Sequence, residues 1–112
     1  MSLVYYKTAE RPDLQFWLED DAGNLVDFSS GYTFAFKIGY RGSTATFTKT
    51  TGITGAAGSG TETSGTPNVT VTFSAGDLDS VSAGKYQWQI KATSSSLDRF
   101  YQGNIEIRDV IL

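Results

Sequence analysis

Serine and lysine are the first residue types in this chain that could act together in catalysis. The 112 residues include no histidine and no cysteine, so a serine nucleophile lacks its usual base and thiol chemistry is excluded. Ser82 and Lys85 stand close together in the sequence, and a Ser–Lys arrangement needs no histidine. Such spacings arise by chance in a serine-rich stretch, so we expect no enzymatic activity and no catalytic residues.

Carboxylates provide a second candidate, a site for a hard cation such as Ca²⁺. They bracket one predicted hairpin and recur in a later loop: Glu19, Asp20, Asp21, Asp27, Asp77 and Asp79. The segment DDAGNLVDF does not reproduce the Ca²⁺ loop of an EF-hand, which requires Gly at the sixth position and Glu at the twelfth. Acidic residues beside a turn commonly solvate it. We therefore predict no metal site and no cofactor.

Aromatic residues provide a third candidate, a platform for a sugar ring or a partner protein. Trp17 lies opposite the apolar face of its predicted strand, so it is either exposed or buried in a strand that is covered on both sides. An outward Trp could stack on a sugar ring. Burial is favoured, because Trp is highly buried on average. Tyr40 is the other candidate platform.

Composition bears on several other classes of protein. The net charge is −3 and the pI about 4.7, with Lys and Arg scattered singly, which argues against binding to nucleic acid or anionic lipid. No apolar stretch approaches the roughly 20 residues of a membrane span. The N-terminus lacks a basic region followed by an apolar one, so we expect no export by a signal of its own. The length suits a single domain, 1–112, with one core.

Alternation of apolar and polar residues predicts strands throughout and no helix. Seven or eight strands at spacings of about ten residues predict an all-β, antiparallel sandwich or a small barrel, and we expect the sandwich. The expected strands cover 4–8, 13–20, 25–28, 32–40, 43–50 and 68–74, a strand with Tyr86, Trp88 and Ile90, and a last strand with Tyr101, Ile105 and Ile107. DDAGN (20–24) has the composition of a hairpin turn.

One segment has almost no apolar residues. TGITGAAGSGTETSGTP (51–67) is nearly all Gly, Thr, Ser and Ala, a composition that buries too little apolar surface to order itself. It predicts a long mobile loop with Ile53 as its one anchor. Loops of this length are uncommon in compact domains and are often functional.

A turn-rich segment that contains two aliphatic residues links two of the predicted strands. In FSAGDLDSVSAGKYQWQIKAT (73–93), Leu78 and Val81 would close one end of the core where the chain crosses between sheets. Tyr86 then begins the next strand. Its hydroxyl could bond to upstream backbone, as in the tyrosine corner of immunoglobulin-like sandwiches, or Tyr86 could be one more core aromatic.

Four segments follow one another in a recognisable order: LQFWLEDDAGNLVDF, YTFAFKIG, VTVTFSAGDLDSVSAGKYQWQI and RFYQGNIEIRDV. This order resembles the N-terminal immunoglobulin-like domain of phage baseplate upper proteins and related tail proteins. The matching elements are Asp20 to Asn24, Val69 to Phe73, Leu78, Gly84 to Tyr86, and Gly103 to Ile107. The resemblance covers the chain from about residue 13 onward, but segment 51–67 is longer and richer in Gly and Thr than the family pattern.

The resemblance implies an immunoglobulin-like β-sandwich in a non-enzymatic structural protein of a tailed-phage or prophage virion. Such a protein would be made in the cytoplasm of the host bacterium and act in the tail or baseplate. Its partners would be other virion proteins and copies of itself, not nucleic acid or membrane. Two other functions stay open: a glycan-binding adhesion module that uses Trp17 or Tyr40, and a capsid decoration or head-fibre protein.

Overall fold

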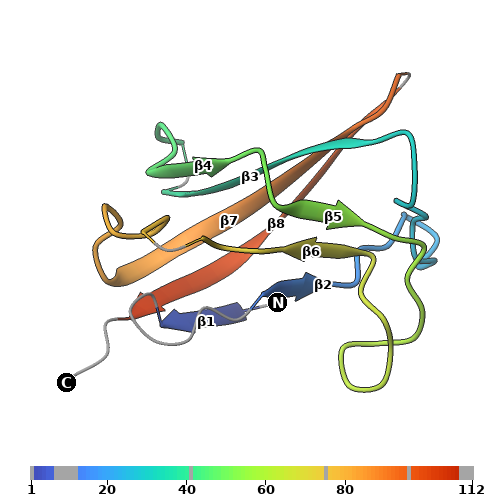
Figure 1. The fold of residues 1–112 in the computed structure, drawn as a ribbon, viewed down its shortest axis with the longest axis horizontal. Helices are drawn as coiled ribbons and strands as arrows, with labels where there is room; N and C mark the ends of the chain where they lie inside the picture. Colours follow the sequence, from blue (N-terminus) through green and yellow to red (C-terminus); the bar gives the residue numbers. More distant parts are fainter. Residues whose placement is uncertain (1, 7–12, 41, 75, 96, 109–112) are drawn as a thin grey trace.

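A computed structural model describes residues 2–6, 13–40, 42–74, 76–95 and 97–108. These residues form eight β-strands and no helix (Figure 1). The strands are β1 (Ser2–Tyr6), β2 (Leu14–Phe16), β3 (Thr33–Gly39), β4 (Phe47–Lys49), β5 (Ile53–Gly55), β6 (Val69–Val71), β7 (Gly84–Thr93) and β8 (Asp98–Arg108). A five-stranded sheet in the order β1-β8-β7-β3-β4 packs against a three-stranded sheet in the order β2-β6-β5. The predicted all-β architecture with two sheets is confirmed.

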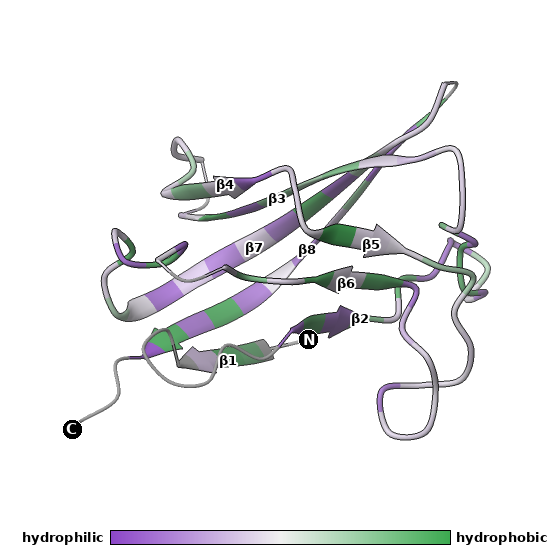
Figure 2. Ribbon diagram, in the orientation of Figure 1, coloured by the Kyte–Doolittle hydropathy of each residue, from purple (hydrophilic) through white to green (hydrophobic). Residues whose placement is uncertain are grey.

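The core lies between the two sheets and contains the residues that the alternation predicts. Figure 2 shows this alternation of hydropathy along β7 and β8. On β7, Tyr86, Trp88 and Ile90 are buried. The ring of Trp88 reaches across the core to Phe16 of the other sheet, with 4.8 Å between ring centroids. Its register partner on β8 is Gly103, so no side chain opposes the large indole on that side.

The prediction of a purely antiparallel sandwich is wrong for one pair of strands. β1 runs parallel to β8, with Ser2 opposite Asn104 and Tyr6 opposite Arg108. After β1 the chain passes to β2 in the other sheet, so no hairpin forces β1 to run opposite to its neighbour. The expected strand 4–8 starts earlier than predicted, and its last two residues lie outside the described part of the chain.

The predicted turn at 20–24 is confirmed. The Asp20 side chain accepts hydrogen bonds from the backbone N–H groups of Ala22 and Asn24 at 2.9 and 3.0 Å. Gly23 adopts φ = 84°, a left-handed conformation that glycine reaches without steric cost. The strand expected at 25–28 does not form, because Phe28 donates its N–H to the carbonyl of Ala56 instead of continuing the hairpin.

The prediction of a long loop at 51–67 is wrong for much of the segment. Residues 53–55 form β5, which pairs with β6. Farther along, Ser59 and Thr66 exchange two backbone hydrogen bonds of 2.9 and 2.8 Å and close a second hairpin. Backbone pairing therefore orders a segment that has little apolar surface to bury. The expected anchor, Ile53, is half-buried against the core.

A fully buried asparagine joins this region to the first hairpin. The Asn68 side chain accepts a hydrogen bond from Leu18 N–H at 2.8 Å and donates to the carbonyls of Leu18 and Val26 at 2.8 and 2.9 Å. These hydrogen bonds replace the backbone bonds that a neighbouring strand would form with Leu18, which lies beyond the end of β2. A side chain therefore replaces a missing piece of sheet.

The segment between β6 and β7 crosses from one sheet to the other, as predicted. Leu78 and Val81 are buried within the hydrophobic core. Tyr86 donates its hydroxyl hydrogen to the carbonyl of Ser82, four residues upstream, at 2.7 Å. The hydrogen bond expected of a tyrosine corner is therefore present.

An ion pair ties the crossover to β4. Lys49 is 8% exposed, and its Nζ lies 2.9 Å from Oδ2 of Asp77. The same carboxylate accepts the backbone N–H of Ser74 at 2.8 Å. The bond from Lys49, followed by that from Ser74, lowers the pKa of Asp77 from its ordinary value of 3.8.

Replacing Asp77 with Asn is expected to destabilise the fold at pH 7, with the loss disappearing in acid. Because the pKa of Asp77 is lowered by folding, its stabilising effect is present above 3.8 and is lost as the pH falls through the folded-state pKa. Urea unfolding of wild type and D77N at pH 7 and at about pH 2 measures this. D79N, at an exposed carboxylate in the same loop, is the control. A difference between wild type and D77N that does not change with pH would contradict the argument.

Candidate interaction face

Four carboxamides form a compact group on the outer face of the five-stranded sheet. Alternation along β7 and β8 places these side chains opposite the core. We call Gln87, Gln89, Gln102 and Asn104 the amide patch. Gln87 is the register partner of Asn104, and Gln89 that of Gln102. The patch is therefore a two-by-two array on neighbouring strands, about 5 Å apart across the strands and about 7 Å along them.

The amide patch has unused hydrogen-bonding capacity. Within the described part of the chain, none of its four carboxamides forms a hydrogen bond with another protein group. Each carboxamide offers two N–H donors and one oxygen acceptor. The patch is thus neutral, and it presents donors and acceptors together on a rigid sheet.

A turn at the end of β3 forms a wall beside the amide patch. Ser43 N–H donates to the carbonyl of Tyr40 at 3.1 Å, and Thr46 N–H donates to that of Ile38 at 2.8 Å. This turn shortens the strand expected at 43–50 to the three residues of β4. It passes so close to Gly39 that a Cβ on that residue would lie 3.1 Å from Cα of Ala45.

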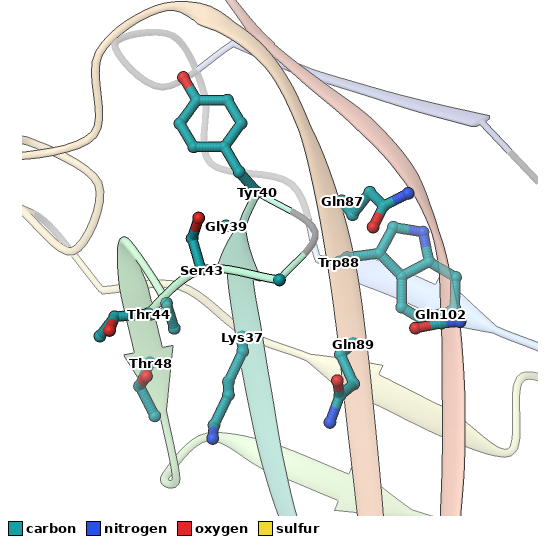
Figure 3. A pocket seen from close by; sticks show the side chains of 12 residues that line it. Lys37, Gly39, Tyr40, Ser43, Thr44, Thr48, Gln87, Trp88, Gln89 and Gln102 are labelled. Carbon is teal, nitrogen blue, oxygen red and sulfur yellow. The ribbon is translucent and has the colours of Figure 1, made fainter.

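Two hollows flank this wall. The first, of about 450 Å³, is lined by Lys37, Thr48 and three amides of the patch (Figure 3). The second, of about 540 Å³, is lined by residues of β1, β7 and β8 that include Val4, Lys85 and Glu106. Tyr40 and Gln87 line both hollows. The two hollows therefore meet at these two residues.

Tyr40 is the exposed aromatic residue beside the two hollows. It is 57% exposed, and its ring lies 5.0 Å from that of the buried Tyr86 with an interplanar angle of 32°. One side of the Tyr40 ring is thus supported by the core and the rest is open to solvent. Figure 3 shows the ring at the rim of the first hollow.

Charged residues border the amide patch. Lys37 on β3 is the register partner of Gln89, and Lys91 follows Gln89 on the same face of β7. Lys37 lies beside the first hollow and Lys85 beside the second. Glu106 forms a two-point contact with Arg108, at 2.9 Å to Nε and 3.1 Å to Nη2. These hydrogen bonds lower the pKa of Glu106 and keep it ionised.

Trp17, the favoured aromatic candidate in the sequence, holds the second hairpin in place. It is half-buried, and its indole N–H donates to the carbonyl of Ser59 at 3.1 Å. This partial burial falls between the two alternatives, because the face that carries Trp17 also carries the exposed Gln15 and is not covered as a whole. Trp17 is therefore a less open platform than Tyr40.

Three of the six carboxylates singled out in the sequence stabilise local structure. Asp20 holds its own turn, Asp27 accepts the backbone N–H of Ser29 at 2.9 Å, and Asp77 pairs with Lys49. The bonds to Ser29 lower the pKa of Asp27. Among the described residues, no three acidic side chains gather closely enough to hold a metal ion.

Ser82 and Lys85 form no hydrogen bond with each other in the described structure. Ser82 uses its backbone carbonyl to accept the hydroxyl of Tyr86, and Lys85 faces the second hollow. The amide patch was not among the predicted sites. Its signal is the repeated pattern YQWQ (86–89) and YQGN (101–104), which places polar amides at alternate positions in both strands.

Comparison of the chain with protein-family models, curated proteins and solved structures finds no match. The described residues include no helix that is long and apolar enough to cross a membrane. The strand order, the exposed surfaces and the chemistry of the side chains are the features that bear on function.

Proposed function

We propose that this protein is a non-enzymatic structural module of a tailed-phage or prophage particle, with an immunoglobulin-like fold and a place in the tail or baseplate. The strand order supports the fold assignment. In variable-type immunoglobulin domains a sheet with strands G, F, C and C′ faces a sheet that contains B, E and D. The orders β8-β7-β3-β4 and β2-β6-β5 follow this arrangement, and Tyr86 occupies the corner position at the start of β7.

The proposed mode of action, contact with neighbouring subunits, rests on the projecting end of the β7–β8 hairpin. Figure 1 shows this hairpin extending beyond the other strands. Near its tip, Leu97 is 49% exposed and Phe100 is 61% exposed. Apolar side chains on a projecting hairpin can insert into a neighbouring subunit, and symmetry multiplies such contacts in an assembly.

The tip has the rigidity that such a contact requires. The Ser94 side chain accepts the backbone N–H of Leu97 at 3.2 Å and donates to its carbonyl at 3.0 Å. Lys91 Nζ lies 5.6 Å from the centre of the Phe100 ring and 3.8 Å from the carboxylate of Asp98. The partners we propose are other virion proteins and further copies of this chain.

A role without catalysis is supported by the use of the reactive groups. Asp20 and Asp27 hold turns, and Asp77 holds the crossover. Each of these groups stabilises the sandwich on which the exposed surfaces are displayed. The surfaces themselves carry amide, hydroxyl and isolated apolar side chains.

Composition analysis of purified particles tests the proposed location. Particles released from the strain that encodes this chain should contain it in several copies after density-gradient purification and quantitative mass spectrometry. Antibody labelling in the electron microscope should place it on the tail. Labelling of the head would replace the tail assignment with a decoration role, and absence from every particle and assembly intermediate would refute the proposal.

Substitutions at the hairpin tip test the proposed contact. The double variant Leu97→Ser, Phe100→Ser should fold, because both residues are exposed, but it should be incorporated into particles much less than wild type. Ser95→Ala, at an exposed polar residue of the same turn, is the control. Normal incorporation of the double variant, with unchanged thermal unfolding, would show that the tip makes no assembly contact.

A further inference from the structure

We propose that Tyr40 and the amide patch form a binding site for a neutral oligosaccharide. This site lies on the outer face of the five-stranded sheet, and its Gln102 is the next residue on that face after Phe100 of the proposed assembly contact. The inference does not depend on a location in a phage particle. It concerns the chemistry of one surface of this chain.

The hydrogen-bonding character of the amide patch matches that of sugar hydroxyls. A hydroxyl group donates one hydrogen bond and accepts others, and a carboxamide can serve both needs from one planar group. The four carboxamides have no partner in the described protein, so a ligand would not first have to break internal bonds. Their spacing of about 5 by 7 Å on paired strands allows several hydroxyls of one or two sugar rings to be bound together.

Tyr40 supplies the apolar contact that sugar recognition also needs. One face of a pyranose ring is rich in C–H groups and packs against an aromatic side chain. The Tyr40 ring is 57% exposed, and Tyr86 supports it from behind at 5.0 Å. Because the ring is already packed on the core, a ligand would lose little free energy in ordering it.

The shape of the surface favours a chain of sugars over a single small molecule. The hollows of about 450 and 540 Å³ are each within the usual size range of ligand sites, about 300 to 1,000 Å³, and they meet at Tyr40 and Gln87. A short oligosaccharide could pass through both hollows with its middle ring on Tyr40. Lys37, beside the first hollow (Figure 3), could donate further hydrogen bonds to hydroxyls.

The same observations argue against a protein as the ligand of this face. The buried centre of a protein interface is rich in apolar and aromatic side chains. Here the exposed large apolar residues are Tyr40, Val4 and Phe100 at the margins of the face, and the four uncharged amides lie between them, where an apolar centre would be needed. Covering these amides with apolar surface would leave their donors and acceptors unsatisfied.

A glycan array followed by NMR titration tests the inference. The labelled full chain is applied to an array of neutral bacterial and plant oligosaccharides, and a glycan that binds is titrated into ¹⁵N-labelled protein. We expect chemical-shift changes in the side-chain amides of the patch and in the backbone at Tyr40. Binding to no neutral glycan on the array, or shift changes confined to another face, would overturn the proposal.

Three variants separate the roles of the ring and the amides. Tyr40→Ala and Gln89→Ala should each weaken binding about tenfold or more, while Gln15→Ala, at an exposed Gln on the other sheet, should leave it unchanged. Unfolding midpoints near that of wild type would show that the variants are folded. Unchanged affinity in Tyr40→Ala would overturn the proposal. If the NMR resonances of the amide patch broaden with protein concentration in the absence of glycan, the patch is a self-association surface, and the proposal is also overturned.

Discussion

Replacing Asn68 with Ala is expected to lower the free energy of unfolding by about 3 kcal/mol, because it leaves two buried backbone groups without hydrogen bonds and removes one of the two bonds to a third. The two groups are the N–H of Leu18 and the carbonyl of Val26. The third is the carbonyl of Leu18, which keeps the bond from Val26 N–H at 3.1 Å. Small domains are stable by about 5 to 15 kcal/mol, so the loss is a large share of the total. Urea unfolding monitored by Trp fluorescence measures it.

Asn104→Ala is the matched control for this substitution. Asn104 is exposed on β8 and forms no hydrogen bond within the described structure, so its loss should change stability by less than about 0.5 kcal/mol. Equal stability of the two variants would show that the Asn68 contacts contribute nothing. Asn68→Asp adds a second check, since its buried carboxylate would face two carbonyls. That variant should gain stability as the pH falls and the carboxyl becomes protonated.

Replacing Gly55 with Ala should destabilise the fold by about 2 to 3 kcal/mol through overpacking. A Cβ on Gly55 would overlap the carbonyl oxygen of Phe28 and would come within 2.9 Å of the Phe34 ring. The φ angle of Gly55 is not positive, so the reason for glycine here is space. The overlap would push residue 28 away from Ala56 and weaken the bond that joins the two segments at 2.9 Å.

Gly84→Ala separates this steric effect from the general effect of removing a strand glycine. A Cβ on Gly84 would meet its nearest neighbour, an atom of the Tyr86 ring, at an ordinary distance of 3.7 Å. The free energy of unfolding of Gly84→Ala should therefore stay within about 0.5 kcal/mol of that of wild type. Hydrogen exchange at the Phe28 amide should accelerate in Gly55→Ala alone. Similar unfolding midpoints for the two variants would contradict the steric argument.

Local periodicity was sufficient to predict the core. Phe36, Ile38, Val69, Val71 and Phe73 alternate with polar residues and are buried as expected. The same holds for Leu78 and Val81, because aliphatic residues inside a turn-rich segment are expected to pack against the core. These predictions needed no knowledge of which strands pair.

The parts that the sequence did not reveal depend on partners far away in the chain. Segment 51–67 is ordered by backbone hydrogen bonds to residues such as Phe28 and Asn68. Such bonds cannot be predicted from amino-acid composition. Asn68 resembles a polar residue at a strand start, and its role is visible only once Leu18 lies beside it. Amphipathic patterns likewise give no strand direction, so the parallel pairing of β1 was missed.

The candidate site was also predictable only in part from the sequence. Alternation predicts that Gln87 and Gln89 face away from the core, but their proximity to Gln102 and Asn104 depends on the register between β7 and β8. That register is set by the turn that joins the two strands. Tyr40 could be named as a platform from the sequence, whereas its support by Tyr86 required the fold.

The pairing of β1 with β8 delays completion of the larger sheet during translation. Ser2 lies beside Asn104, so the binding partner of the first strand leaves the ribosome only when synthesis of the described chain is almost finished. At about 5 to 20 residues per second, β1 waits on the order of 5 to 20 seconds while later strands emerge. For that period it is an unpaired strand open to chaperones and to neighbouring nascent chains.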